Sequence, residues 1–84
     1  MIKIIDFYAD WCGPCQRLKP ILKEIESERD DVNVEYINID ENMDLAQEKG
    51  VASLPTIIFE KDGVEYNRIQ GLVTKQKIIS VVES

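Results

Sequence analysis

The chain has no histidine and only two cysteines, Cys12 and Cys15. A structural zinc site takes about four ligands, usually cysteine and histidine side chains, so this chain alone is not expected to bind a metal. The same scarcity excludes the set of disulfides that stabilises many small secreted domains. A bond between cysteines so close in sequence would restrict the unfolded chain very little. The pair is therefore predicted to serve chemistry rather than stability.

Basic residues are also scarce, with ten Lys and Arg against sixteen Asp and Glu and a net charge of −6. Nucleic-acid binding needs a basic surface that can neutralise phosphates, so nucleic acid is not an expected partner. The acidic residues are scattered along the chain, which is typical of a solvated surface.

Long apolar runs are absent, and none approaches the roughly 20 residues that span a bilayer. Residues 1–6 lack the charged, apolar and small-residue regions of a signal peptide. We therefore expect a cytoplasmic protein with no membrane contact, in a compartment where a cysteine pair is more often catalytic than structural. The length of 84 residues and the hydrophobic fraction of 44% predict one globular domain over residues 1–84.

The pattern of apolar residues predicts seven elements in the order β-α-β-α-β-β-α. The strands are expected at 2–8, 32–39, 56–60 and 64–69, and the helices at 14–29, at 43–49 and after Thr74. The final helix is expected to bury Ile78, Ile79 and Val82.

The order of these elements predicts an α/β fold. The first strand–helix–strand unit implies a parallel, right-handed crossover, and the turn at Asp62-Gly63 implies an antiparallel hairpin. We therefore expect a mixed four-stranded sheet with helices on both faces. Polar Asn33 and Glu35 alternate with apolar residues in the second strand, which places that strand at a sheet edge.

The cysteines lie in the motif Trp11-Cys12-Gly13-Pro14-Cys15, between a strand and a helix. Cys12 precedes the helix, where unpaired N–H groups and the positive end of the helix dipole favour a thiolate, so Cys12 is the expected nucleophile. Cys15 lies one turn into the helix and suits the resolving role, in which it attacks the mixed disulfide on Cys12 and releases the reduced product.

Three residues beside the thiols have predicted contact roles. Gly13 and Pro14 permit a tight turn and leave the dithiol uncovered. Trp11 is either a core residue or, next to a reactive thiol, a partly exposed contact surface for polypeptide substrates.

Asp6 interrupts an otherwise apolar strand that leads directly into the dithiol loop. Burial would raise the pKa of its carboxyl, because a charge is costly to bury without a partner. A carboxyl that holds a proton there suits the role of general base for Cys15. The alternative is a solvated carboxylate at a sheet edge.

Leu54-Pro55-Thr56 precedes the third predicted strand. A proline at this point is an ordinary feature of a strand start, and a cis bond is a minority outcome for the sequence alone.

Taken together, these motifs resemble the thioredoxin family. The resemblance runs in order through nearly the whole chain, and the residues that carry it are Asp6-Phe7-Tyr8-Ala9-Asp10-Trp11-Cys12-Gly13-Pro14-Cys15, Pro20, Asn38-Ile39-Asp40, Leu54-Pro55-Thr56, Asp62-Gly63 and Gly71. The residues between the cysteines are those typical of thioredoxins, whereas disulfide isomerases usually carry Gly-His and glutaredoxins Pro-Tyr. The chain resembles a minimal form of the family without the usual first strand and helix.

The resemblance implies a role for several residues in this sequence. Cys12 would attack, Cys15 would resolve, and Asp6 would be the buried acid. Pro55 would be a cis-proline, and Leu54 would offer its backbone to the substrate.

The remaining substrate-binding positions follow from the same resemblance. Trp11, Gly71 and the segment 50–51 would border the docking surface, together with Gly13 and Pro14. Many members have a lysine near the buried acid where this chain has Tyr36, so Asp6 is expected to be harder to ionise.

The sequence thus predicts a monomeric protein-disulfide reductase. It would need no bound cofactor, because the Cys12–Cys15 pair itself cycles between dithiol and disulfide, and a thioredoxin reductase would restore the dithiol. The alternatives are a glutaredoxin-like or oxidising redox protein, and a binding module that uses the surface around Trp11 without turnover.

Overall fold

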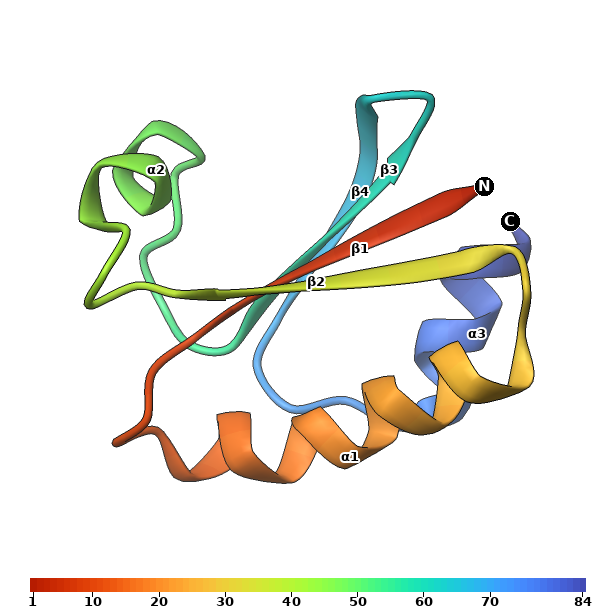
Figure 1. Cartoon of the computed structure of the whole chain (residues 1–84), viewed down its shortest axis with the longest axis horizontal. Helices are drawn as coiled ribbons and strands as arrows, with labels where there is room; N and C mark the ends of the chain where they lie inside the picture. Colours follow the sequence, from red (N-terminus) through yellow and green to blue (C-terminus); the bar gives the residue numbers. More distant parts are fainter.

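The computed structural model describes all 84 residues, which form four strands and three helices (Figure 1). In chain order the elements are β1 (Ile2–Tyr8), α1 (Gly13–Glu28), β2 (Val32–Asn38), α2 (Met43–Glu48), β3 (Thr56–Lys61), β4 (Val64–Gln70) and α3 (Lys75–Glu83). The predicted order is confirmed, with boundaries that differ by at most one residue. None of the three helices has both the length and the apolar character needed to span a membrane.

The strands form one mixed sheet in the order β2-β1-β3-β4. β1 is parallel to β2 and antiparallel to β3, and β3 is antiparallel to β4. The predicted crossover and hairpin are both present, and Asp62 and Gly63 turn the hairpin with φ angles of 54° and 80°. As expected from its polar alternation, β2 lies at an edge of the sheet, whereas β1 lies inside it.

Helices cover both faces of the sheet, also as predicted. α1 and α3 lie on one face, below the strands in Figure 1, and α2 lies on the other side at one end. The larger core lies under α1 and α3 and consists of Ile2, Ile4, Leu18, Leu22, Ile25, Val32, Val34, Ile57, Phe59, Ile78, Val81 and Val82. A smaller core under α2 contains Ile5, Phe7, Ala46 and Ile58.

One detail of the final helix differs from the prediction. α3 buries Ile78, Val81 and Val82, whereas Ile79 is only half-buried. Residues 78, 81 and 82 follow the i, i+3, i+4 spacing of one helix face, and position 79 lies at its rim. Thr74 caps α3 as predicted, because its side chain accepts a hydrogen bond from the N–H of Lys77 at 3.2 Å.

The outer edge of β2 is partly occupied by a side chain of α1. The carboxylate of Glu26 accepts a hydrogen bond at 2.9 Å from the backbone N–H of Val34. No neighbouring strand lies on the outer side of β2 to bind such a group. On the opposite face of the sheet, Lys3 of β1 and Glu35 of β2 form an ion pair at 3.3 Å. Side-chain interactions therefore link the edge strand β2 to α1 and to β1.

Replacing Leu22 with alanine should destabilise the fold, because Leu22 is fully buried where α1 meets the sheet. The expected loss is about 2–5 kcal/mol of unfolding free energy, measured by urea unfolding of the disulfide form. Arg17→Ala, at an exposed position of the same helix, is the control and should change stability by less than about 0.5 kcal/mol. Equal effects of the two substitutions would contradict the packing described here.

Candidate active site

The two cysteines meet where β1 passes into α1. Residues 9–12 connect the strand to the helix, and Cys12 and Cys15 form a disulfide with their Cα atoms 5.3 Å apart. Because β1 is an interior strand and α1 is anchored on the sheet, both sulfur atoms have fixed positions. The structure therefore brings the predicted pair together.

Cys12 is the N-cap residue of α1. Its backbone is extended and its sulfur accepts a hydrogen bond from the N–H of Cys15 at 3.3 Å. A thiolate formed at this sulfur after reduction would face the same N–H and the positive end of the helix dipole. No acidic residue in the first turn of α1 opposes this effect. The geometry therefore favours ionisation of Cys12.

The two sulfur-bearing residues differ in accessibility. Cys12 has 7% of its surface exposed and Cys15 has 2%. Cys12 also lines a surface hollow, which Cys15 does not reach. An incoming substrate would consequently meet Cys12 first.

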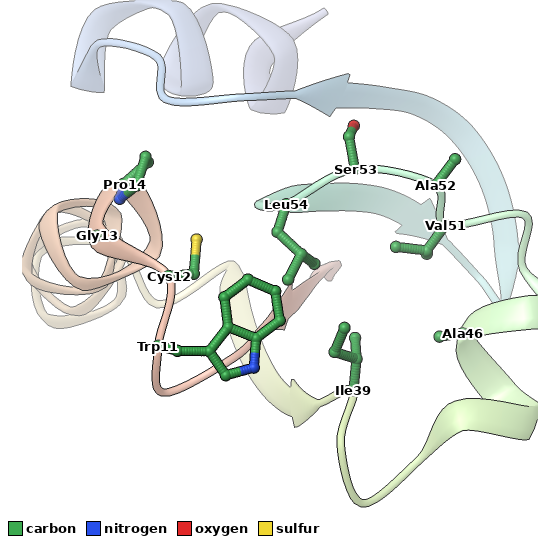
Figure 2. A pocket seen from close by; sticks show the side chains of 10 residues that line it. All are labelled: Trp11, Cys12, Gly13, Pro14, Ile39, Ala46, Val51, Ala52, Ser53 and Leu54. Atoms are coloured by element: carbon green, nitrogen blue, oxygen red, sulfur yellow. The ribbon is translucent and has the colours of Figure 1, made fainter.

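The hollow beside Cys12 is mainly apolar and has a volume of about 520 Å³. In Figure 2, Cys12 and Trp11 form one side of it, and Leu54 and Val51 lie across from them. The full lining consists of Trp11, Cys12, Gly13, Pro14, Ile39, Ala46, Val51, Ala52, Ser53 and Leu54. An extended polypeptide segment with apolar side chains fits such a surface.

Most of the predicted contact residues line this hollow, but Gly50, Pro55 and Gly71 do not. Pro55 is fully buried, and the half-buried Gly71 donates its N–H to the Pro55 carbonyl at 2.8 Å. The Leu54–Pro55 bond is cis, as the resemblance implied. The hydrogen bond between Gly71 and Pro55 therefore links the start of β3 to the end of β4 directly beside Leu54, while neither residue lines the hollow.

Four lining residues were missed from the sequence: Ile39, Ala46, Ala52 and Ser53. They come from the end of β2, from α2 and from the loop before β3, so no single motif contains them. Isolated small or apolar residues at element ends carry no signal until the fold brings the three segments together.

Trp11 is 70% exposed, which excludes the alternative that it belongs to the core. Its indole Nε1–H donates a hydrogen bond to a carboxylate oxygen of Asp40 at 2.9 Å. This bond holds the ring at the rim of the hollow, close to Cys12 (Figure 2).

Asp6 is buried, with 1% of its surface exposed, and its Oδ1 atom has no hydrogen-bond partner. Burial raises the pKa of this carboxyl to about 7, while the positive charge of Lys19 on α1 lowers it. The alternative of a solvated carboxylate at a sheet edge is wrong, because β1 lies between β2 and β3. The predicted rise in pKa is confirmed.

Tyr36 stands beside Asp6 in the register between β1 and β2. Its hydroxyl is buried without a partner, and burial together with the charges of Glu26 and Asp6 raises its pKa to about 12. Tyr36 is therefore neutral at physiological pH and supplies no charge to Asp6. No group of three or more His, Cys, Asp or Glu side chains is placed to hold a metal.

This combination of fold and site defines a thiol–disulfide oxidoreductase with the thioredoxin fold. The family model described as Thioredoxin matches residues 1–84, and the chain belongs to the thioredoxin family. Thioredoxin of Chlamydia caviae is 43% identical over 79 residues, which cover 94% of this chain and 78% of that protein. Thioredoxin of Rickettsia typhi is 46% identical over 77 residues, which cover 90% of this chain and 73% of that protein.

Solved structures give the same result. A mutant thioredoxin from Halobacterium salinarum NRC-1 superposes with a TM-score of 0.91 at 38% identity, covering 98% of this chain and 72% of that one. Oxidised mitochondrial thioredoxin 3 from Saccharomyces cerevisiae superposes with a TM-score of 0.88 at 33% identity, covering 98% of this chain and 76% of that one. The predicted fold and thiol–disulfide oxidoreductase activity are both confirmed.

Membership of the family also implies disulfide-containing protein substrates and a reductase partner. The relatives include bacterial thioredoxins and the mitochondrial thioredoxin-2 of Schizosaccharomyces pombe. The cytoplasmic location therefore stays a prediction.

The buried acid should make stability depend on pH. The unfolded chain releases the Asp6 proton near pH 4, whereas the folded protein keeps it until about pH 7. Since the folded state binds more protons in this interval, its stability falls as the pH rises. Asp6→Asn removes this loss. The unfolding free energy of the variant relative to that of wild type should therefore rise by roughly 2–4 kcal/mol between pH 4 and pH 8.

Urea unfolding of the disulfide form at both pH values measures this gain. Asp30→Asn, which removes a carboxylate at an exposed position, is the control for the loss of one acidic side chain, and an equal gain in this variant would contradict a specific effect of the buried carboxyl. A constant effect of Asp6→Asn across the range would show that the buried carboxyl does not titrate as described.

Proposed function

We propose that this protein reduces disulfides in other proteins, with Cys12 as nucleophile, Cys15 as resolving thiol and Asp6 as proton acceptor. The observation that carries the proposal is the asymmetry of the pair. Cys12 lies at the helix N-terminus and lines an apolar hollow, and Cys15 is buried directly behind it.

In the first step, the Cys12 thiolate attacks one sulfur of a substrate disulfide. A bond forms between Cys12 and that sulfur, the substrate S–S bond breaks, and the leaving thiolate takes a proton from water. The hydrogen bond from the Cys15 N–H stabilises the attacking thiolate.

In the second step, Cys15 loses its thiol proton to the Asp6 carboxylate and attacks the sulfur of Cys12. The Cys12–Cys15 disulfide forms while the bond from Cys12 to the substrate breaks, which releases the second substrate thiolate. Asp6 suits this role because it lies on the α1 side of β1, as Ile2 and Ile4 do, and because its pKa of about 7 lies near physiological pH.

The hollow is the proposed docking surface for the polypeptide around the substrate disulfide. Neither the N–H nor the C=O of Leu54 takes part in a hydrogen bond within the protein, so both can pair with an extended substrate segment. The hydrogen bond from Gly71 to Pro55 holds the residue next to Leu54 in place. Gly13 and Pro14 keep the approach to Cys12 open, since no larger side chain covers it.

The proposal also includes the oligomeric state, the cellular location and the redox partner of the protein. The 84 residues act as one domain and as a monomer in the cytoplasm, the Cys12–Cys15 pair is the only redox group, and a thioredoxin reductase returns it to the dithiol. The apolar docking surface supports a polypeptide substrate over the small peptide glutathione.

Substitution of each cysteine should separate the two steps. With dithiothreitol as reductant, the wild type should accelerate insulin reduction and Cys12→Ser should abolish the acceleration. Cys15→Ser should instead accumulate a mixed disulfide with the substrate, detected by mass spectrometry. Mixed disulfides that accumulate on Cys15 in Cys12→Ser would reverse the assigned roles, and a disulfide readily reduced in glutathione buffers would favour an oxidising protein.

Truncation of Trp11 should weaken reduction of proteins more than reduction of small disulfides. Because Trp11 is exposed at the rim of the hollow, Trp11→Ala should lower kcat/KM for insulin by roughly 5- to 20-fold, the effect of losing an aromatic contact residue. The rate with Ellman's reagent, which reaches Cys12 without the docking surface, should change by less than about twofold.

Val64→Ala is the matched control, because Val64 is 66% exposed at the β3–β4 hairpin and does not line the hollow. It should leave both rates unchanged. Equal losses with insulin and Ellman's reagent in Trp11→Ala would place the role of the indole at the thiol itself.

A further inference from the structure

We infer that Lys19 is a positioning residue for the resolving step, in which it favours the ionised form of Asp6 while Cys15 gives up its proton. The inference rests on the proposed function, because it concerns the acid that accepts this proton. It assigns a role to a lysine that lies outside the dithiol motif and outside the hollow.

Lys19 is held above the site by two aromatic rings. Its Nζ atom lies 5.4 Å from the ring centre of Tyr8 and 5.5 Å from that of Tyr36. Both distances are within the range of cation–π attraction. The rings come from the neighbouring strands β1 and β2, so the ammonium is fixed over the junction of these strands.

Asp6 lies at this same junction. It is paired in register with Tyr36 and is two residues from Tyr8, whose side chain points to the same face of β1. Its Oδ1 atom is buried and accepts no hydrogen bond, so the carboxylate has no direct partner in the protein. A nearby cation is then the main interaction that can favour its charged form.

Lys19 lies on the same side of α1 as Cys15. The two residues are four apart on α1, which places their side chains on one face of the helix. Tyr8, one of the two rings over which Lys19 lies, also packs against the cluster that contains Cys15. Cys15, Asp6 and Lys19 therefore all lie where α1 faces β1 and β2. The positive charge of Lys19 lowers the pKa of Asp6, against the rise caused by burial.

The other ionisable groups around Asp6 act differently. Tyr8 and Tyr36 are the aromatic partners of the lysine. The raised pKa of Tyr36 keeps its hydroxyl neutral at physiological pH, and Ile57 of β3, which pairs with Asp6, carries no charge. Glu26 lies farther along α1 against Tyr36 and binds the Val34 N–H.

Lys23 also contacts Tyr36, at 5.3 Å from the ring centre, but it is exposed and makes no contact with Tyr8. It is therefore a matched control for Lys19, since both lysines lie on α1 and over the same ring.

The direct test is a carbon NMR titration of the Asp6 carboxyl in the disulfide form, in which neither cysteine titrates. Lys19→Met should raise the titration midpoint by roughly 0.2–0.7 pH unit, the size expected for one half-exposed charge. Lys19→Arg should restore the wild-type midpoint, and Lys23→Met should leave it in place. An unchanged midpoint in Lys19→Met, or an equal shift in Lys23→Met, would overturn the inference.

A kinetic test then connects the titration with the reaction. The release of product from the mixed disulfide, followed in single turnovers, should show the same upward shift of its pH midpoint in Lys19→Met. The rate at high pH should stay that of wild type, because Asp6 is ionised there in both proteins. In an Asp6→Asn background, Lys19→Met should have no further effect on the rate.

If Lys19→Met still slowed product release in the Asp6→Asn background, Lys19 would act through another group, contrary to the inference. The titration tests the inference independently of reductase activity. A wild type without reductase activity would reject the proposed function, while the NMR midpoints would still decide whether Lys19 acts on Asp6.

Discussion

The packing of α1 on the sheet is the constraint on which the rest of the site depends. Leu18, Leu22 and Ile25 are fully buried against β1, β2 and β3, and their burial fixes the position of the first turn of the helix. That turn presents one N–H group to the Cys12 sulfur and places Cys15 underneath. The reactivity of the pair is thus set by hydrophobic contacts one to three turns away.

Asp6 is a buried carboxyl at a position of β1 where an apolar residue would be more stable. An apolar residue at position 6 would pack against α1 without a desolvation penalty, whereas Asp6 leaves an unpartnered oxygen inside the protein. The same burial brings the carboxyl into the pH range in which it can both take and release a proton. Burial thus both lowers stability and gives the carboxyl the pKa that its proposed role as proton acceptor requires.

Local patterns in the sequence were sufficient to predict the seven elements, the edge position of β2, the dithiol and the buried acid, because each depends on spacing within a short segment. The lining of the hollow was only partly predictable, since Ile39, Ala46 and Ala52 become neighbours only after three segments converge. The ionic environment of Asp6 was missed for a related reason. The sequence comparison pointed to position 36 on the adjacent strand, whereas the charge comes from Lys19 on a helix packed across the sheet.

The hydrogen bond between Glu26 and Val34 has a consequence for encounters between molecules. A sheet edge offers a row of unsatisfied backbone groups onto which a strand from another chain can be added, which is the first step of fibril growth and of domain exchange. On β2 the Glu26 carboxylate already occupies the donor at the third residue of the strand. An incoming strand would have to displace this carboxylate and place its own carbonyl oxygens beside a negative charge. A single glutamate on α1 thereby opposes the addition of a strand at the β2 edge of the sheet.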